Sequence, residues 1–388
     1  MIQYPQSKTI PDTVYTGLWN DEIPVYTVFS THGLNHLVGY VRHINAGNGT
    51  VLYRGQCNLY PSITPSIFHD SSSETVNKER LNQAVANIKN DESMLKFFHL
   101  DTTDVVGWDL YQKLTIEAAL QHYGARTYCV DFVDNHWTAL WFGLYRWNQS
   151  TKNYERRTSE KADKEDDLIR FTLDFGSPTS LPVEPDPIEV SNLSDRQMKS
   201  LKSIAKKSGK DLDILISGKL YSLNAQKRTI WLQRCEQIKE QNSQRENRIN
   251  AFNVDSAKGH MFLFLYVADT NCPTMHGISF GEQTYTVDLR KVLPSVFLRP
   301  GSQHGWIVRG KKENYQFNSR VVCVARINID LVDEMLGNGS LVRTDNFFPS
   351  YKFDQGYHVL LERQINSPIR SKTKNPKIIP ENTIPSYF

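Results

Sequence analysis

One short stretch joins an arginine to a glycine at the end of a β-prone run, Leu52-Tyr53-Arg54-Gly55-Gln56. Arginine offers a fixed fork of donors that suits phosphate or carboxylate, and glycine lets a ligand or a backbone come close. The commonest role of an arginine is a surface or salt-bridged one. The position at a strand end, followed by glycine, nevertheless favours an anion-binding role for Arg54, with Tyr53, Gly55 and Gln56 as ligand-binding candidates.

A second stretch places an imidazole and a carboxylate nine residues apart, in Gln121-His122-Tyr123-Gly124 and the run up to Asp131. His122 could act as an acid/base group or as a hydrogen-bond donor, and Gln121 and Tyr123 flank it. The alternative is a histidine satisfied within the core. Asp131 could orient His122, bind a ribose hydroxyl or pair with Arg54, and it could equally cap a helix that begins near Asn135.

A third candidate segment lies far downstream, where Gln303 stands between Arg299-Pro300 and Gly305. A glutamine amide has donors and an acceptor that fit a ribose or another amide. Turn chemistry is the alternative, because Pro300-Gly301 is itself a turn signal.

These segments together resemble the FRG domain family, which is named for a (Phe/Tyr)-Arg-Gly motif. The family arginine that follows the threonine of the second segment is absent here, because Tyr128 stands after Thr127 and an arginine precedes it at Arg126. We therefore expect any ligand contact of that arginine to have moved to Arg126. The matching segments are Tyr53-Arg54-Gly55-Gln56, Gln121-His122-Tyr123-Gly124 with Thr127 and Asp131, Arg299-Pro300 with Gln303 and Gly305, and Phe347-Phe348-Pro349-Ser350 with Asp354 and Tyr357.

The order of these residues also resembles the three-strand layout of ADP-ribosyltransferases, which implies NAD as the leading ligand. In that layout Arg54 would clamp phosphate, Thr127 and Gln303 would meet ribose, and an aromatic wall would come from Tyr53, Tyr123 or Trp306. A glutamine stabilises an oxocarbenium-like charge poorly. NAD binding without turnover, and NAD cleavage with Asp131 as the acid, therefore both stay open.

The FRG resemblance implies a nucleotide-type small molecule as the partner and a role in prokaryotic defence, phage defence included, or in stress responses. The alternative from another class is a non-catalytic ligand-sensing or protein-interaction module. In that case the inserted and terminal segments described below would bind a protein partner.

The composition excludes several classes of protein. The chain has 388 residues, a net charge of +3 and 39% hydrophobic residues, so it can form a large core but gives no strong electrostatic case for nucleic acid. Its five cysteines show no CxxC spacing, which favours reduced thiols in a cytoplasmic protein with no metal. No apolar stretch approaches the roughly 20 residues of a membrane span. The oligomeric state is not predictable from these features.

Hydrophobic periodicity predicts an α+β protein with a mixed or antiparallel sheet core, packed helices and a largely helical insertion. The expected parts are an N-terminal segment (1–45), a first FRG-like part (46–147), the insertion (148–250), a second FRG-like part (251–363) and a basic, Pro-containing tail (364–388). The first 30 residues are expected to be irregular apart from an edge strand near Val25–Phe29. The expected helices cover 32–45, 137–147, 195–207 and 347–361, and the expected strands cover 127–132, 261–269, 285–289, 306–308 and 321–329.

Overall fold

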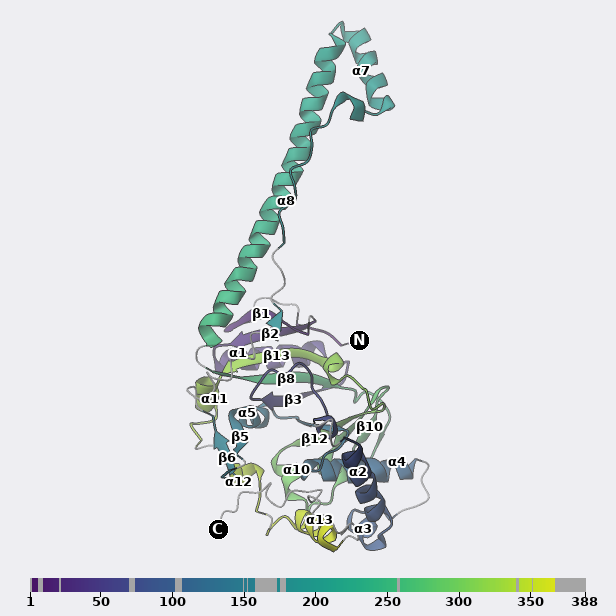
Figure 1. Ribbon diagram of the computed structural model, residues 1–388, viewed down its shortest axis with the longest axis vertical. Helices are drawn as coiled ribbons and strands as arrows, with labels where there is room; N and C mark the ends of the chain where they lie inside the picture. The colour runs from purple at the N-terminus through teal and green to yellow at the C-terminus, as the bar shows by residue number, and fades with distance from the viewer. Residues whose placement is uncertain are drawn as a thin grey trace. The chain divides into compact units, whose positions relative to one another are not determined.

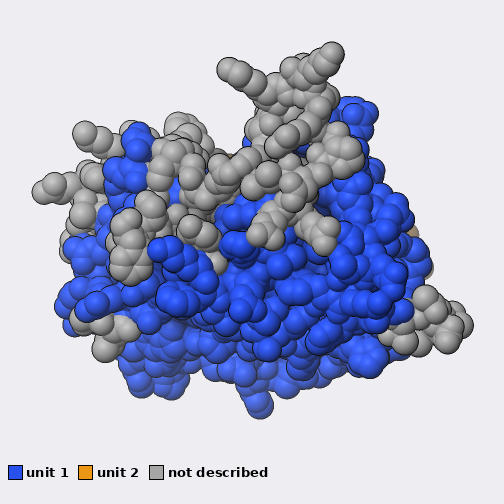
Figure 2. Space-filling model, turned by 90° about the horizontal axis from the view of Figure 1, so that it is seen from below, with its two compact units in different colours: residues 1–174, 251–388 blue, residues 175–250 orange. Residues whose placement is uncertain are grey.

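The computed structural model describes residues 2–5, 10–20, 22–69, 74–101, 107–148, 150–151, 153–157, 173–174, 179–256, 259–339, 342–350 and 352–366. Most of the charged segment after residue 157 and the predicted tail beyond residue 366 lie outside these ranges. Most contacts between residues fall within one of two compact units, residues 1–174 with 251–388 and residues 175–250, which Figure 2 colours separately.

The first unit is built on a mixed sheet that has eleven strands among the described residues, in the order β7-β1-β2-β13-β8-β3-β4-β12-β11-β10-β9. The pair β2–β13 is parallel and the other pairs are antiparallel. The predicted α+β class is therefore confirmed. The strands of this sheet are β1 (Thr13–Trp19), β2 (Ile23–Val28), β3 (Thr50–Gln56), β4 (Cys129–Val133), β7 (Leu173–Asp174), β8 (His260–Ala268), β9 (Thr274–Met275), β10 (Ile278–Phe280), β11 (Thr284–Asp288), β12 (Gly305–Gly310) and β13 (Val321–Asn328). The strands β5 (Tyr145–Asn148) and β6 (Asn153–Arg156) pair in a separate two-stranded sheet.

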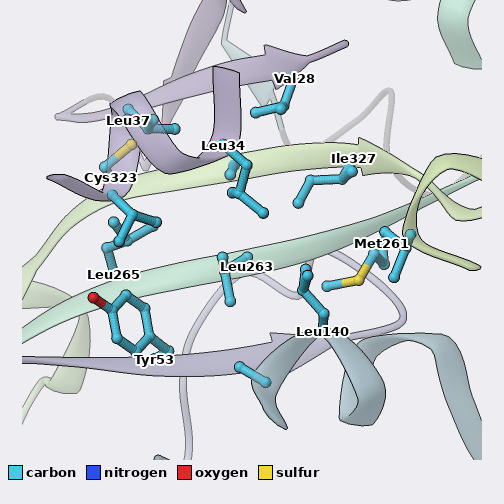
Figure 3. Packing of buried hydrophobic residues seen from close by; sticks show 14 of the residues in the cluster. Val28, Leu34, Leu37, Tyr53, Leu140, Met261, Leu263, Leu265, Cys323 and Ile327 are labelled. Atoms are coloured by element: carbon cyan, nitrogen blue, oxygen red, sulfur yellow. The ribbon is translucent and has the colours of Figure 1, made fainter. Parts of the chain in front are cut away.

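Helices pack against this sheet and form two hydrophobic clusters with it. In the first, α1 (Thr31–Ile44) and α5 (His136–Leu144) lie against β2, β13, β8 and β3; Figure 3 shows Leu34 and Leu37 near Cys323 and Ile327. The other helices of this unit are α2 (Glu74–Lys89), α3 (Glu92–Phe97), α4 (Trp108–His122), α9 (Leu289–Val292), α10 (Leu298–Ser302), α11 (Ile329–Met335), α12 (Thr344–Phe347), α13 (Gln355–Asn366) and the short 3₁₀ turns η1 (Ser66–Phe68) and η5 (Phe317–Arg320). The second cluster joins the strands β4, β10, β11 and β12 to α2, α3, α4, α9 and α13, whereas α11 and α12 contribute to the first.

The central strand β8 is buried along its whole length, because it pairs with β13 on one side and with β3 on the other (Figure 1). Its continuous apolar sequence is typical of a strand buried on both faces. The tyrosine of the Tyr-Arg-Gly segment, Tyr53, joins this core from β3 and is 1% exposed.

Three expectations about elements were wrong. The helix expected over 137–147 ends at Leu144, and Tyr145–Asn148 form the strand β5 instead. The strand expected at an edge near Val25–Phe29 is β2, which lies between β1 and β13. The prolines of the first 30 residues lie outside the strands or, like Pro24, near a strand start, so they do not prevent the β1–β2 hairpin. The helix expected over 347–361 is two helices, α12 and α13, separated by a segment that contains Pro349.

The second unit contains the turn η4 (Val190–Asn192), the helix α7 (Asp195–Ser208) and most of the long helix α8 (Leu212–Ser256). A capping box of Ser194 and Gln197 opens α7. An extended, proline-containing segment runs antiparallel to α8. Backbone groups of Thr179 and Ile188 exchange two hydrogen bonds each with the amides of Asn242 and Asn224, respectively.

Candidate functional site

The candidate site lies where the sheet divides between β3 and β4. Strand β3 pairs with β8 over seven residues, from Thr50 to Gln56. Between β3 and β4, whose residues are all described, the register contains the pair Tyr53↔Val133 alone. Beyond this pair the two strands separate, and the Nη1 of Arg54 donates a hydrogen bond of 2.8 Å to the backbone oxygen of Asp131.

A pocket of about 390 Å³ opens at this point. Most of the residues predicted from the sequence line it, namely Tyr53, Arg54, Gly55, Gln121, His122, Arg126, Asp131, Arg299 and Gln303. Segments from the first sixth of the chain to its last quarter therefore converge on one concavity. The other lining residues are Ser66, Gly124, Ala125, Phe132, Val133, Ala139, Phe142, Tyr154 and Phe348.

Arg54 has the chemistry of an anion-binding residue. Burial lowers the pKa of its guanidinium and the carboxylate of Asp131 opposes that effect, but arginine remains charged because its pKa lies so far above neutrality. One nitrogen bonds the backbone of Asp131, whereas Nε is buried and has no partner within the described protein. A buried donor without a partner is costly, so an acceptor supplied by a ligand would stabilise this arrangement.

Arg299 has a different environment, although it also lines the pocket. It is 3% exposed, and its guanidinium carbon lies 5.0 Å and 4.9 Å from the ring centres of Tyr123 and Phe348. Its Nη1 donates to the backbone oxygen of His122, at the last residue of α4. Arg299 thus fixes the end of the helix that presents His122 to the pocket.

His122 and Asp131 face each other, with 3.7 Å between Nδ1 and the carboxylate Oδ1. The other carboxylate oxygen accepts a hydrogen bond from the Gln121 amide. Gly305 is required beside the imidazole, since a Cβ there would lie 2.9 Å from Cε1 of His122. The expected alternative in which Asp131 caps α5 was wrong, because the side chain of Asn135 performs that role.

Gln303 lines the pocket, and its Nε2 donates to the backbone oxygen of Phe347 at 2.8 Å. It follows α10, a short helix where the sequence indicated a turn. The amide therefore links α10 to α12, and the protein already uses one of its two N–H donors.

Three further predicted residues, Thr127, Tyr123 and Gln56, are not among those that line the pocket. Thr127 is fully buried and donates to Gln121, Tyr123 donates to the carboxylate of Asp354, and Gln56 lies at the end of β3. Arg126 is exposed and lines the pocket, whereas Tyr128 packs against Phe68 on another side. The glycine of the Tyr-Arg-Gly segment serves packing, as a Cβ on Gly55 would lie 1.7 Å from the backbone oxygen of Ala139 in α5.

The aromatic wall consists of Phe142, Tyr154 and Phe348, and sequence reasoning did not propose these residues for it. Tyr154 stacks on Phe348 with 4.5 Å between ring centres. Of the residues expected there, Trp306 donates its Nε1 to Asp134 and Tyr53 packs in the core. Tyr154 lies in a charged stretch that looked solvated, so only the Phe347-Phe348 segment gave a signal.

Comparison with known proteins identifies the region that carries the site. Residues 49–153 match the family model of the FRG domain. The chain carries an FRG domain. The matched range includes Arg54, His122 and Asp131, whereas Arg299 and Gln303 lie beyond it. No curated protein and no solved structure matches the chain.

The described residues contain no group of three or more His, Cys, Asp or Glu side chains placed to hold a metal ion. Within the same ranges, every helix is too short or too polar to cross a membrane.

Proposed function

We propose that the FRG domain of this chain binds a nucleotide-type ligand, with NAD as the leading candidate, in the pocket between β3 and β4. The observation that carries the proposal is the unpartnered Nε of Arg54 in a pocket that three guanidinium groups line. Such groups bind phosphate oxygens through strong, charge-assisted hydrogen bonds. The rings of Phe142, Tyr154 and Phe348 offer a surface for a base or a nicotinamide.

The size of the pocket supports a ligand of this class. A volume of about 390 Å³ is at the lower end of the range for small-molecule sites. We therefore expect one half of a dinucleotide to be enclosed, with the other half at the mouth near the exposed Arg126. A prokaryotic defence or stress role remains part of the proposal through the family resemblance alone.

The proposed activity is ADP-ribosyltransferase-like transfer or NAD cleavage. Among the described lining residues Asp131 carries the carboxylate, and in the proposed layout Gln303 would take the place of the late acid of such enzymes. If the site is catalytic, Asp131 would stabilise the positive charge that develops on the ribose.

A ligand sensor without turnover is the second candidate. It is favoured by Gln303, whose donor bonds the backbone of Phe347. In this case a protein partner would respond to ligand binding. The second unit offers exposed apolar side chains on α8 for such a partner, with Ile214 69% and Tyr221 79% exposed.

Calorimetry and an NAD consumption assay on the wild type and the variant Arg54→Ala test the proposal. We expect the variant to bind NAD at least about tenfold more weakly, because a charge-assisted hydrogen bond contributes more than one decade of affinity. The control is Arg156→Ala, which removes a surface arginine that pairs with Asp333 away from the pocket. Thermal melting checks that both variants fold.

Three outcomes are informative. Turnover by the wild type that Arg54→Ala loses supports the enzyme, and binding without turnover supports the sensor. A wild-type protein that binds neither NAD nor ADP-ribose nor ATP would contradict the nucleotide proposal.

A further inference from the structure

The hydrogen bonds behind the pocket have a direction that can be followed atom by atom. The hydroxyl oxygen of Thr127 accepts from the backbone N–H of Cys129 at 3.0 Å, and that of Ser66 accepts from the backbone N–H of Thr127 at 3.2 Å. Each hydroxyl has one proton. Both oxygens lie near Oε1 of Gln121, at 2.6 Å for Thr127 and 3.4 Å for Ser66.

The positions of its heavy atoms alone leave the orientation of the Gln121 amide ambiguous, and the Asp131 carboxylate resolves it, because a carboxylate only accepts hydrogen bonds. The NH₂ group of Gln121 therefore faces Asp131 and donates to Oδ2 of that carboxylate, since the flipped amide would place an oxygen against it. Oε1 then faces the two hydroxyls, and each of them donates its proton to this amide oxygen.

The remaining carboxylate oxygen of Asp131, Oδ1, lies 3.7 Å from Nδ1 of His122. This distance slightly exceeds a hydrogen bond, and such bonds at reactive sites often shorten when a ligand binds. A carboxylate only accepts hydrogen bonds. The neutral imidazole therefore carries its proton on Nδ1, and Nε2 has the lone pair.

Nε2 of His122 is buried and has no partner within the described protein, and the side chain is 5% exposed. Two residues that line the pocket thus each carry a buried nitrogen without a partner in the described protein, a donor on Arg54 and an acceptor on His122. We propose that Ser66, Thr127 and Gln121 are positioning residues that set His122 as a proton acceptor toward a hydroxyl or water of the bound molecule.

This inference rests on the proposed function for the identity of the ligand and narrows its chemistry. The ligand must present an anionic oxygen to Arg54 and an O–H donor to His122, which is the chemistry of a phosphorylated sugar. Thr127, which sequence reasoning placed on a ribose, acts instead through Gln121 and Asp131.

Nitrogen NMR of the histidine-labelled full-length protein tests this series of hydrogen bonds without any ligand. At alkaline pH, where imidazoles are neutral, long-range couplings distinguish the two tautomers, and the variant His122→Gln identifies the signal of His122. We expect a roughly tenfold or larger excess of the Nδ1–H form in the wild type, because a carboxylate favours a donor strongly.

The variant Asp131→Asn gives the sharper result. Gln121 still donates to the amide oxygen, so the new NH₂ group faces Nδ1 and the imidazole must change to the Nε2–H form. The control Asp134→Asn alters a neighbouring carboxylate that binds Arg290 and Trp306, and we expect it to leave the tautomer unchanged.

A wild-type Nε2–H form, or a tautomer that Asp131→Asn does not change, overturns the inference. Neither result bears on NAD affinity, which calorimetry measures separately. A correct tautomer in a protein that binds no nucleotide would contradict the proposed function and leave the hydrogen-bond chain intact.

Discussion

At the scale of single residues, the three residues of the Tyr-Arg-Gly segment have different structural roles. Tyr53 packs in the core, Arg54 lines the pocket and Gly55 lets α5 approach β3. Adjacent residues on a strand point to opposite faces, so Tyr53 places its ring in the core and Arg54 directs its side chain to the other face, although both residues border the pocket.

Gly55 gives a direct test of the packing role. A methyl group there would overlap the backbone oxygen of Ala139, which cannot move without shifting α5. We expect Gly55→Ala to lower the free energy of unfolding by about 3 kcal/mol or more, measured by urea denaturation. The matched control is Gly39→Ala on the exposed face of α1, where nothing lies within 4 Å, and it should be neutral or slightly stabilising. Equal stability of the two variants would show that the close approach is not required.

The residues that sequence reasoning found were charged or polar side chains with unusual chemistry in short motifs. Arg54 lies near the end of β3, His122 is the last residue of α4 and Asp131 is the central residue of β4, and all three line the pocket. Their functional roles stay predictions. The aromatic wall was not predictable because Phe142 and Tyr154 look like ordinary helix and loop residues until β6 folds back on β5. The support role of Thr127 was equally hidden, because a hydroxyl gives no sign in the sequence of which group it bonds.

At the scale of elements, the periodic patterns predicted α1, α7, β8 and β13 well, since each has a clear apolar face or a continuous apolar run. The hairpin of β1 and β2 was missed because prolines near it suggested irregular chain. Strand order was not predictable from local patterns at all. The division of the sheet between β3 and β4 depends on which distant strands pair, and that division creates the pocket.

The start of α5 should make stability depend on pH. Burial and, to a lesser extent, the positive charge of Arg42 lower the pKa of His136, the first residue of this helix, to about 4. The unfolded chain has the ordinary histidine pKa of about 6.5 and binds the proton more readily between pH 6.5 and 4. Stability from this residue is therefore complete above pH 6.5 and falls as the pH drops through that window.

Melting temperatures measured at pH 7 and pH 5 for the wild type and His136→Gln check this expectation. The wild type should lose more stability on acidification than the variant, which has no imidazole at this position. An equal loss in both proteins would show that His136 is not protonated more readily on unfolding.

At the scale of the whole molecule, the described pocket lining belongs entirely to the first unit. Replacing residues 175–250 by a long Gly/Ser linker should therefore leave NAD affinity within about threefold of the wild type, since binding contacts stay intact. Calorimetry on the shortened protein measures this. A large loss of affinity would mean that the helical unit takes part in ligand binding, and a loss of turnover alone would point to a role in the reaction.

The two halves of the sheet are joined between β3 and β4 by a single register pair, and this has a consequence for how the ligand preference can change. Arg54 belongs to one half and Asp131 to the other, with Tyr53 and Val133 as the register pair that joins them. Helix α5 lies against both strands and supplies Ala139 and Phe142 to the lining, so its packing helps to set the width of the opening. We expect substitutions of apolar α5 residues outside the lining, such as the core residue Leu140, to adjust which molecules fit while leaving the reactive groups untouched.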